Sequence, residues 1–304
     1  MNSRKQKARY AFLVLRLVLP KGSLERATLE LFQEADLALK RSSEVDYAAT
    51  IDDPRVQEVR ILRPQEIPVY VAEGLFDLGI TGRDWIDETD SKVKSLGTLA
   101  YSKATSNPIR VVLAVSNASG VKKAEELQDG VRVSTEYPNL TRKYFDMKGI
   151  KAEIRLSYGA TEAKIPEIAD AVVEITETGR ALKAAGLRVI DELLISRTEL
   201  VANIEAFEDP IKRHAMEQIR TLLEGTLEAR DKVLVKLNVE TDSLDAVLAV
   251  LPSLKSPTIS ELSGGGAFAV ETVVPKSAIN ILIPDLKDRG ATDILEIPLS
   301  KIVH

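Results

Sequence analysis

Polar residues that could bind a ligand lie close together in the stretch "ADAVVEITETGRALKAAGL" (169–187), namely Asp170, Glu174, Thr176, Thr178 and Gly179. Asp170 and Glu174 bracket an apolar run that reads as a strand, and the loop 176–179 leads into a helix-like segment. Open α/β sheets bind ligands at the carboxyl ends of their strands, which is where Glu174 would lie. Backbone N–H groups at a helix N-terminus favour an anion, and Gly179 would let it approach closely. The carboxylates could accept hydrogen bonds from sugar hydroxyls, and the adjacent loop could bind a phosphate. Together they would suit a ribose phosphate as the ligand.

The same stretch fits a plainer interpretation, in which a threonine caps the helix and both acids face water. Thr176 and Thr178 could serve in either case, as caps or as hydroxyl donors to a phosphate. The loop lacks the Walker lysine, so it is not a P-loop nucleotide site.

Other charged or glycine-containing turns follow expected strands. Lys21 and Gly22 join the first strand to the first helix, where a lysine suits a phosphate. Arg63 could hold a phosphate through two parallel hydrogen bonds. Asp84 and Glu136 each follow a strand and could line a ligand edge. Taken singly, each of these features is better explained as an ordinary exposed turn.

Composition excludes several kinds of site. The chain has no cysteine, and its only histidines are His214 and His304, so disulfides, thiolate zinc sites, a cysteine nucleophile and a Ser-His-Asp triad are not expected. The formal net charge of −5 gives no reason to expect binding to nucleic acid or a membrane surface. Residues 1–22 are interpreted as a basic leader and a buried strand rather than a signal peptide, and no run approaches the roughly 20 apolar residues of a membrane span. The expected location is cytoplasmic.

Strand-like runs alternate with helical periodicity along the chain, whose 304 residues suggest two or three domains at roughly 100–200 residues each. This alternation indicates an α/β architecture with mostly parallel sheets. A helix is expected at 23–37 with Ser23 as a possible N-cap, and another from Leu140 with Asn139 as its cap. Strands are expected at 11–20, 58–62, 76–80, 110–116, 131–135, 152–157 and 170–176.

A long amphipathic helix is expected over 210–232, and the pattern changes after it. The following elements read as β-α-β-β-α-β, which is the ferredoxin-like order. The first helix of this module is expected at 242–251. The stretch "SGGG" (263–266) is expected to be a turn within the module. A separate C-terminal module of about 75 residues is therefore predicted.

Together these motifs resemble ATP phosphoribosyltransferase, the first enzyme of histidine biosynthesis. The stretches that carry the resemblance, in the family's order, are "LRLVLPKGSLE", "RPQEIPVYVAEGLFDLGITGRDW", "STEYPNLTRKYF" and "ADAVVEITETGRALKAAGL". "SPTISEL" and "VETVVP" resemble the regulatory domain of the family's long form, so the resemblance covers about residues 12–303. The sequence departs from the family's pattern at two places before the loop. Lys164 stands in a segment that is usually small or apolar, and Glu167-Ile168 stand where Gly-Leu is usual. A third is Glu66, where an aspartate is common.

The resemblance implies a two-lobed catalytic region, like type II periplasmic binding proteins, plus a C-terminal ferredoxin-like regulatory domain. The implied boundaries are 1–105 with 187–225 for lobe I, 106–186 for lobe II with its loop for phosphoribosyl pyrophosphate, and 230–304 for the regulatory domain. That last domain would bind histidine as a feedback inhibitor. Dimers and hexamers are implied, with histidine favouring the larger form.

The implied reaction is pentosyl transfer. N1 of the adenine of ATP attacks the anomeric carbon of phosphoribosyl pyrophosphate, and pyrophosphate leaves to give N1-(5-phosphoribosyl)-ATP. Catalysis would depend on positioning and electrostatics rather than on a protein nucleophile. Mg²⁺ would be coordinated mainly by the pyrophosphate oxygens, and no protein ligands are assigned to it.

Roles for individual residues follow from the matching motifs. Asp170 and Glu174 would contact the ribose hydroxyls and steady the charge that develops on the ring. The 5′-phosphate would be held by Thr176, Thr178, Gly179, Arg180 and Ala181. The cleft around ATP or pyrophosphate would be lined by Lys21, Gly22, Arg63, Asp84 and Glu136. The inhibitor histidine would be bound in the C-terminal domain by Ser256, Thr258 and Thr272.

The alternative is a non-catalytic two-lobed protein that binds a small ligand or regulates another protein. A solute-binding protein would need a signal peptide, and a transcription regulator would need a helix-turn-helix or a basic patch; none is recognised. A catalytically inactive regulatory subunit is disfavoured because the acids and threonines of the loop region are intact. The C-terminal module could also be a dimerisation module without a ligand.

Overall fold

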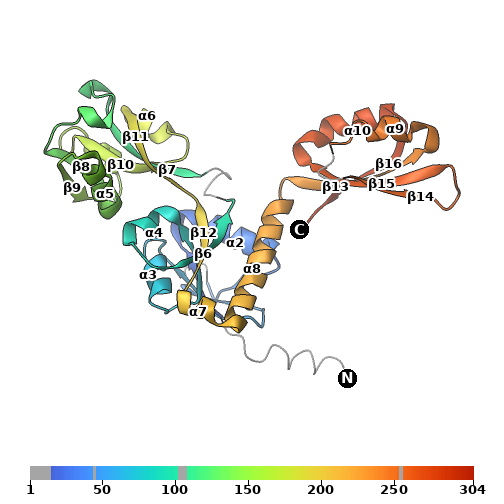
Figure 1. Cartoon of the computed structure of the whole chain (residues 1–304), viewed down its shortest axis with the longest axis horizontal. Helices are drawn as coiled ribbons and strands as arrows, with labels where there is room; N and C mark the ends of the chain where they lie inside the picture. Colours follow the sequence, from blue (N-terminus) through green and yellow to red (C-terminus); the bar gives the residue numbers. More distant parts are fainter. Residues whose placement is uncertain (1–14, 44–45, 102–107, 253–255) are drawn as a thin grey trace. The chain divides into compact units, whose positions relative to one another are not determined.

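The structure is a computed structural model, and it describes residues 15–43, 46–101, 108–252 and 256–304 (Figure 1). The expected basic leader, the first four residues of the expected strand 11–20, and the expected lobe boundary at 105/106 lie outside these ranges. None of the described helices is both long and apolar enough to cross a membrane.

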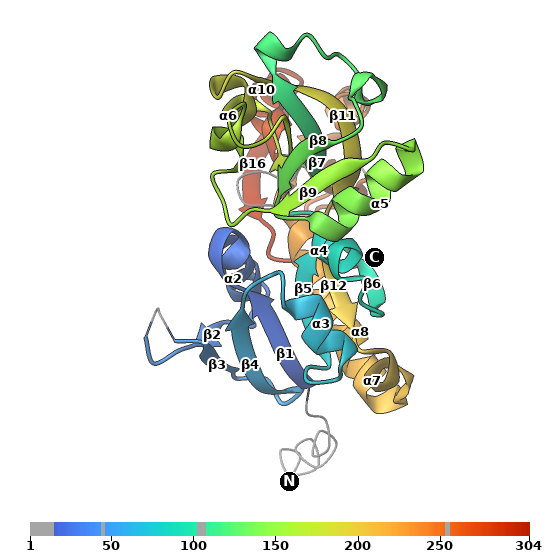
Figure 2. The ribbon, with the colours of Figure 1, turned by 90° about the vertical axis from the view of Figure 1, so that its left-hand side faces the viewer.

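Lobe I is built on a seven-stranded sheet in the order β2-β3-β4-β1-β5-β12-β6 (Figure 2). Its strands are β1 (Leu15–Pro20), β2 (Leu39–Lys40), β3 (Ala48–Ile51), β4 (Val56–Leu62), β5 (Leu78–Gly82), β6 (Lys94–Leu99) and β12 (Thr198–Ala202). Its helices are η1 (Gly22–Leu24), α2 (Glu25–Glu34), α3 (Ile67–Ala72), α4 (Arg83–Thr89) and α7 (Ile204–Glu208).

Helix α2 forms because its apolar positions recur at helical spacing. It buries Thr28, Leu31 and Phe32 along one face, which is the i, i+3, i+4 pattern of an amphipathic helix. The expectation of Ser23 as its N-cap is wrong: Ser23 lies inside the preceding turn η1, and the N-cap residue Leu24 makes no side-chain capping bond.

Lobe II is a five-stranded sheet in the order β11-β7-β10-β8-β9. Its strands are β7 (Ile109–Ser116), β8 (Val131–Thr135), β9 (Ala152–Leu156), β10 (Ala171–Thr176) and β11 (Leu187–Ser196). Its helices are η2 (Asn117–Ser119), η3 (Ala124–Glu126), α5 (Pro138–Lys148), η4 (Thr161–Lys164) and α6 (Arg180–Ala184). Strand β11 pairs with β7, so the chain returns to lobe I only after Ser196, later than the boundary expected at residue 187.

Strand β10 is central in this sheet and is covered on both faces. Ala171 and Val173 pack into one apolar cluster, and Val172 packs into another on the opposite face. This explains the uninterrupted apolar run between the two acids, because a strand buried on both sides shows no alternation.

Both sheets of the catalytic region are mixed, so the expectation of mostly parallel sheets is wrong. β1 pairs parallel with β4 and β5, but β12 pairs antiparallel with β5 and β6. In lobe II, β10 pairs parallel with β8 and antiparallel with β7. Apolar runs identify buried strands but do not report their direction.

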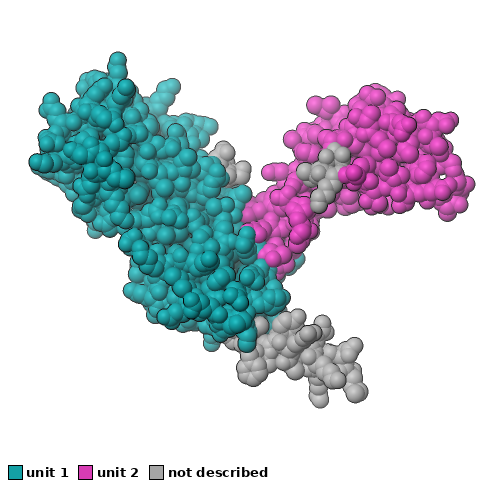
Figure 3. Space-filling model, in the orientation of Figure 1, with its two compact units in different colours: residues 1–220 teal, residues 221–304 magenta. Residues whose placement is uncertain are grey.

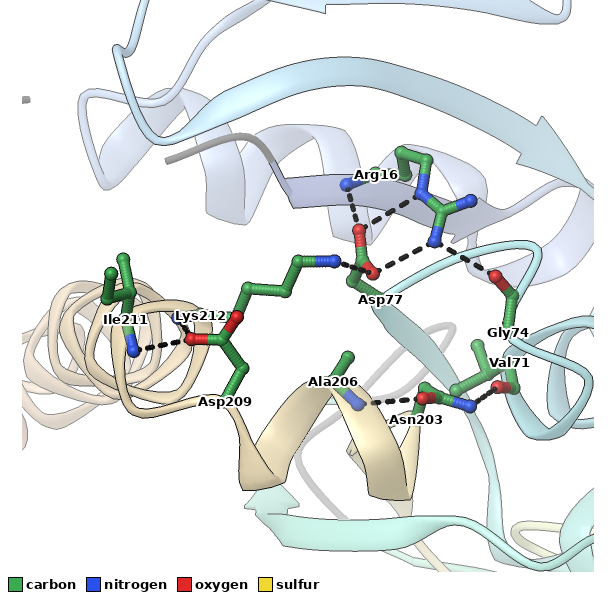
Figure 4. A network of polar contacts seen from close by, with 9 residues as sticks. All are labelled: Arg16, Val71, Gly74, Asp77, Asn203, Ala206, Asp209, Ile211 and Lys212. Carbon is green, nitrogen blue, oxygen red and sulfur yellow. Dashed lines mark hydrogen bonds and ion pairs between the residues drawn. The ribbon is translucent and has the colours of Figure 1, made fainter. Parts of the chain in front are cut away.

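A buried ion cluster joins β1, the start of β5 and helix α8 (Pro210–Ala229) (Figure 4). Asp77 is 1% exposed and accepts hydrogen bonds from Arg16 Nε at 3.1 Å, Arg16 Nη2 at 3.0 Å and Lys212 Nζ at 2.8 Å. Burial opposes the charge of Asp77, but the bonds from Arg16 and Lys212 outweigh it and lower its pKa. Asn203 caps α7 beside this cluster through the N–H of Ala206.

The chain divides into two compact units, residues 1–220 and 221–304 (Figure 3). The second unit carries the expected β-α-β-β-α-β order, in a sheet of order β14-β15-β13-β16. Its elements after the end of α8 are β13 (Lys232–Glu240), η5 (Thr241–Ser243), α9 (Leu244–Leu248), β14 (Thr258–Glu261), β15 (Ala267–Pro275), η6 (Lys276–Ala278), α10 (Ile279–Asp288) and β16 (Ala291–Pro298). The first helix, α9, is shorter than the expected 242–251.

Candidate active site

A cleft of about 890 Å³ lies between lobes I and II. Most of the expected site residues line it: Lys21, Gly22, Arg63, Asp84, Glu136, Thr176, Thr178, Arg180 and Ala181. Their strands β1, β4, β5, β8 and β10 all end at this cleft. The residues therefore meet where the carboxyl ends of the strands in an α/β protein present their loops.

The loop after β10 is held in shape by its own residues. The N–H of Gly179 donates to the hydroxyl of Thr176 at 2.7 Å, and Gly179 has φ +74°, a conformation that favours glycine. Thr176 therefore shapes the loop, and Gly179 permits the turn into α6 without lining the cleft itself. Thr178, Arg180 and Ala181 line the cleft beyond this turn.

Neither Glu174 nor Asp170 is among the residues that line the cleft, and Asp170 is held by Arg132 instead of facing an open ligand edge. Its carboxylate accepts hydrogen bonds from Arg132 Nη2 at 2.7 Å, Arg132 Nε at 3.1 Å and the Arg132 N–H at 2.9 Å. These bonds lower the pKa of Asp170. Asp170 and Glu174 share one face of the strand, but four residues of extended chain separate them by about 13 Å.

Glu174 and Glu136 are half-buried acids without a direct ion pair among the described residues. Burial raises the pKa of Glu174; the Ile175 N–H and the Thr161 side chain partly oppose this, and the negative charges of Glu136 and Glu162 add to it. Burial also raises the pKa of Glu136, against the charge of Lys164. Glu136 lines the cleft. Glu136 directly follows Thr135 and Glu174 directly follows Val173, and these two residues pair across the parallel strands β8 and β10, so the two acids are neighbours.

Asp84 lines the cleft, but its carboxylate is occupied by the protein. It is 2% exposed and accepts hydrogen bonds from Ser196 Oγ at 2.6 Å and Tyr137 Oη at 2.8 Å. Burial raises its pKa despite both bonds. A Cβ at Gly82 would lie 2.1 Å from Asp84 Oδ1, so the glycine makes room for this carboxylate. Asp84 therefore ties α4 of lobe I to lobe II.

Helix α4 makes a second contact with lobe II through Glu88. Its carboxylate accepts the N–H groups of Asn139 at 3.0 Å and Leu140 at 2.8 Å, in the first turn of α5. The expectation that Asn139 caps α5 is therefore wrong: the N-cap position is Tyr137, and an acid from the other lobe takes the free N–H groups.

Several aromatic residues of the cleft were not expected from the sequence. Trp85 and Tyr137 have ring centroids 4.5 Å apart, and Lys21 Nζ lies 3.8 Å from the centroid of the Tyr47 ring. All four line the cleft with Tyr101. Tyr137 sits next to Glu136 in the "TEYPNL" motif, and that adjacency was the one available signal.

The three residues expected to contact histidine do not form one cluster within this chain. Thr258 pairs with Glu271 across β14 and β15, so it shares the face of Glu271, whereas Thr272 points to the other face and is buried. Ser256 and Thr258 are exposed. Thr272 instead lies in line with Val270 and Val274 of the core beneath α9 and α10.

Comparisons with known proteins agree over nearly the whole chain. Residues 63–225 match the family model for ATP phosphoribosyltransferase, and residues 229–301 match the model for the HisG C-terminal domain. An ATP phosphoribosyltransferase of Pelotomaculum thermopropionicum is 46% identical over 289 residues, with 95% of this chain and 99% of the relative covered. One of Solibacter usitatus is 45% identical over 291 residues, covering 96% and 100%.

A solved structure gives the same result for the catalytic region. The ATP phosphoribosyl transferase (HisG:HisZ) complex from Thermotoga maritima contains a chain that is 27% identical, with a TM-score of 0.59. The alignment covers 69% of this chain and 98% of that one. The two-lobed fold is thus found in a structure of an ATP phosphoribosyltransferase.

Proposed function

The chain belongs to the ATP phosphoribosyltransferase family, which joins ATP to phosphoribosyl pyrophosphate in the first step of histidine biosynthesis, and from this premise we propose that the cleft between its lobes is the active site. One observation carries the proposal. Thr176 and Thr178 of lobe II line the same cleft as Lys21 and Arg63 of lobe I. Relatives of this similarity give no support to a non-catalytic binding protein.

The loop after β10 is the proposed subsite for the 5′-phosphate. Thr178, Arg180 and Ala181 line the cleft there, and the first N–H groups of α6 have no acceptor within the helix. The guanidinium of Arg180 lies at the start of α6, where a cation is disfavoured unless an anion is close. A bound phosphate supplies that anion.

Glu174 and Glu136 are the proposed partners of the ribose. In the reaction, N1 of adenine attacks the anomeric carbon while pyrophosphate leaves, so positive charge develops on the sugar ring. Two neighbouring carboxylates stabilise that charge in the transition state more than in the neutral ground state. The ribose hydroxyls can donate to the same oxygens.

The pyrophosphate and the triphosphate of ATP are assigned to the cations of lobe I. Lys21, Arg63 and Arg197 line that side of the cleft. Within the described residues no group of three or more histidine, aspartate or glutamate side chains could hold a metal ion. Mg²⁺ is therefore proposed to enter with the pyrophosphate and to keep most of its ligands as phosphate oxygens and water.

Feedback inhibition by histidine is proposed for the second unit, residues 221–304, together with assembly into homo-oligomers. Ser256, which is exposed just before β14, and Thr258, which is exposed in β14, remain candidates for the ligand, whereas Thr272 is assigned to the core. Thr258→Val should raise the histidine concentration needed for half-inhibition, and Thr272→Val should leave it unchanged.

The activity assay is direct. The protein is incubated with ATP, phosphoribosyl pyrophosphate and Mg²⁺, with and without histidine, and the product absorbance is followed. Formation of phosphoribosyl-ATP is expected, with Arg180→Gln raising KM for phosphoribosyl pyrophosphate more than KM for ATP. An Arg180→Gln enzyme with both KM values unchanged would remove Arg180 from the phosphate subsite.

A further inference from the structure

Helix α4 extends directly from β5 of lobe I, yet three of its side chains contact lobe II beside α5 (Figure 2). Trp85 packs against the apolar cluster of lobe II, and its ring centroid lies 4.5 Å from that of Tyr137. Asp84 accepts the Tyr137 hydroxyl at 2.8 Å, and Glu88 binds the start of α5. Helix α4 is therefore fixed to lobe I by its strand and to lobe II by its side chains.

Glu88 makes the most extensive polar contact of this helix with lobe II. Its carboxylate accepts the N–H groups of Asn139 and Leu140, and Asn139 Nδ2 donates to the backbone carbonyl of Glu88 at 3.1 Å. The two N–H groups lie in the first turn of α5, where they have no acceptor in their own helix. Glu88 is 7% exposed, so water competes little for these charge-assisted bonds.

The contact between Glu88 and α5 lies next to a residue of the cleft. Glu136 and Tyr137 are the two residues between the end of β8 and the start of α5, and both line the cleft. On the side of lobe I, β5 leads into α4 and pairs with β1, which ends directly before the cleft residue Lys21. Helix α4 therefore connects Glu136 of one lobe to Lys21 of the other.

This connection opposes rotation of one lobe against the other. The chain passes from lobe I to lobe II after β6 and returns after Ser196. Lobes that are joined by a few linking residues can rotate about them. Such a rotation would pull Glu88 away from the first turn of α5 and leave a buried carboxylate without its N–H donors.

We propose that Glu88 is a positioning residue of this enzyme: by binding the first turn of α5 from the other lobe, it holds Glu136 in place relative to Lys21. This role rests on the proposed function, in which the cleft is the active site. Glu88 is not among the residues that line the cleft, so it acts on the reaction through α5 and not through the substrate.

The kinetic test is Glu88→Gln, which keeps the shape of the side chain. The amide oxygen can still accept an N–H, but the amide NH₂ cannot, so the paired contact with α5 is lost. The kcat should fall by about tenfold, since a misplacement of about 1 Å away from the chemistry can cost ~100-fold. KM for phosphoribosyl pyrophosphate should rise more than KM for ATP, because the proposed phosphate and pyrophosphate subsites lie on different lobes.

Two further variants check that the effect comes from the contact between the lobes. Asn139→Ala removes the side-chain bond to the Glu88 carbonyl and keeps the backbone N–H, so it should give a smaller loss of the same kind. Asp87→Asn breaks only an ion pair with Arg83 inside α4, and its kcat and both KM values should equal those of wild type. Equal kinetics for wild type and Glu88→Gln would overturn the inference.

A second readout measures the lobes themselves. The chain contains no cysteine, so spin labels can be attached at Arg26→Cys in α2 of lobe I and Met147→Cys in α5 of lobe II, both exposed positions. Pulsed electron paramagnetic resonance, with labelled chains diluted in unlabelled protein, gives the distance between the two labels. Its distribution should be wider in Glu88→Gln than in wild type and unchanged in Asp87→Asn.

The two readouts separate this role from the proposed function. An unchanged distance distribution in Glu88→Gln, or a wider one with the kcat of wild type, would overturn the positioning role. A wild-type chain that lacks phosphoribosyltransferase activity, but whose label distance depends on Glu88, would overturn the proposed function and support the contact between the lobes.

Discussion

Asp77 and the pair formed by Glu136 and Glu174, all in the catalytic unit, have opposite electrostatics. At the amino end of β5, Asp77 is neutralised by Arg16 and Lys212, and its pKa is lowered (Figure 4). At the carboxyl ends of β8 and β10, Glu136 and Glu174 are half-buried without a direct ion pair among the described residues, and their pKa values are raised. Asp77, which ties β1 and β5 to α8, has its cations built in. In the proposed function, Glu136 and Glu174 are left to be neutralised by the positive charge that develops on the substrate in the transition state.

The largest effect is expected from Asp77→Ala. This change leaves the cations Arg16 and Lys212 facing each other without an acid between them. The free energy of unfolding should fall by about 3 kcal/mol, which is the low end of the range for a broken buried ion pair, because both cations can still reach water. Chemical denaturation measures it. Asp52→Ala, which removes an exposed pair with Lys40, is the control and should cost less than ~1 kcal/mol. If both variants lost the same small amount of stability, the role of Asp77 in holding the fold together would be contradicted.

The second effect is on catalysis. Glu174→Gln should lower kcat/KM by about 100-fold, or ~2.7 kcal/mol in the barrier, because a neutral amide does not stabilise the charge on the ring. Its stability should stay within about 1 kcal/mol of wild type. A kcat/KM within about threefold of wild type would contradict the assigned role.

Asp170→Asn tests the other acid of the same strand and should have a smaller effect. Its carboxylate holds Arg132 at the amino end of β10, whereas the cleft lies at the carboxyl end of that strand, so kcat/KM should stay within about threefold of wild type. The stability should fall by about 1 kcal/mol or less, because both side chains of the pair are partly exposed. A loss as large as that of Glu174→Gln would place Asp170 back in the reaction.

The smallest effect is a difference in pH dependence. The folded pKa of Asp77 is lowered, so its stabilisation is complete above its unfolded pKa of about 3.9 and disappears as the pH falls through the lower folded value. The deficit of Asp77→Ala should therefore shrink below about pH 4. The folded pKa of Glu174 is raised, so Glu174→Gln should gain slightly in stability at neutral pH and lose that gain as the pH falls through the raised value. Unfolding curves from pH 3 to 8 would measure the stability of each variant relative to wild type. A change of the same sign at neutral pH in Asp77→Ala and Glu174→Gln would contradict the comparison.

The sequence predicted the alternation of elements and the turn from β10 into α6, because both depend on local pattern. It did not distinguish Asp170 from Glu174, since neighbours in sequence are far apart along an extended strand. It assigned the cap of α5 to Asn139, whereas Glu88 of the other lobe supplies it through a contact between distant parts of the chain. The neutralisation of Asp77 by Lys212 is equally non-local, and no spacing rule connects those two residues.

The place of β12 in the sheet of lobe I also affects how the chain folds during synthesis. β12 lies between β5 and β6 and is buried along its whole length, yet it leaves the ribosome after every strand of lobe II. The strands of lobe II all fall within residues 109–196, so lobe II can fold while lobe I still lacks an interior strand. Until β12 arrives, the facing edges of β5 and β6 are open to other strands. Lobe I is therefore the last part of the catalytic unit to close, and its open edges are the point at which a chaperone would protect the nascent chain.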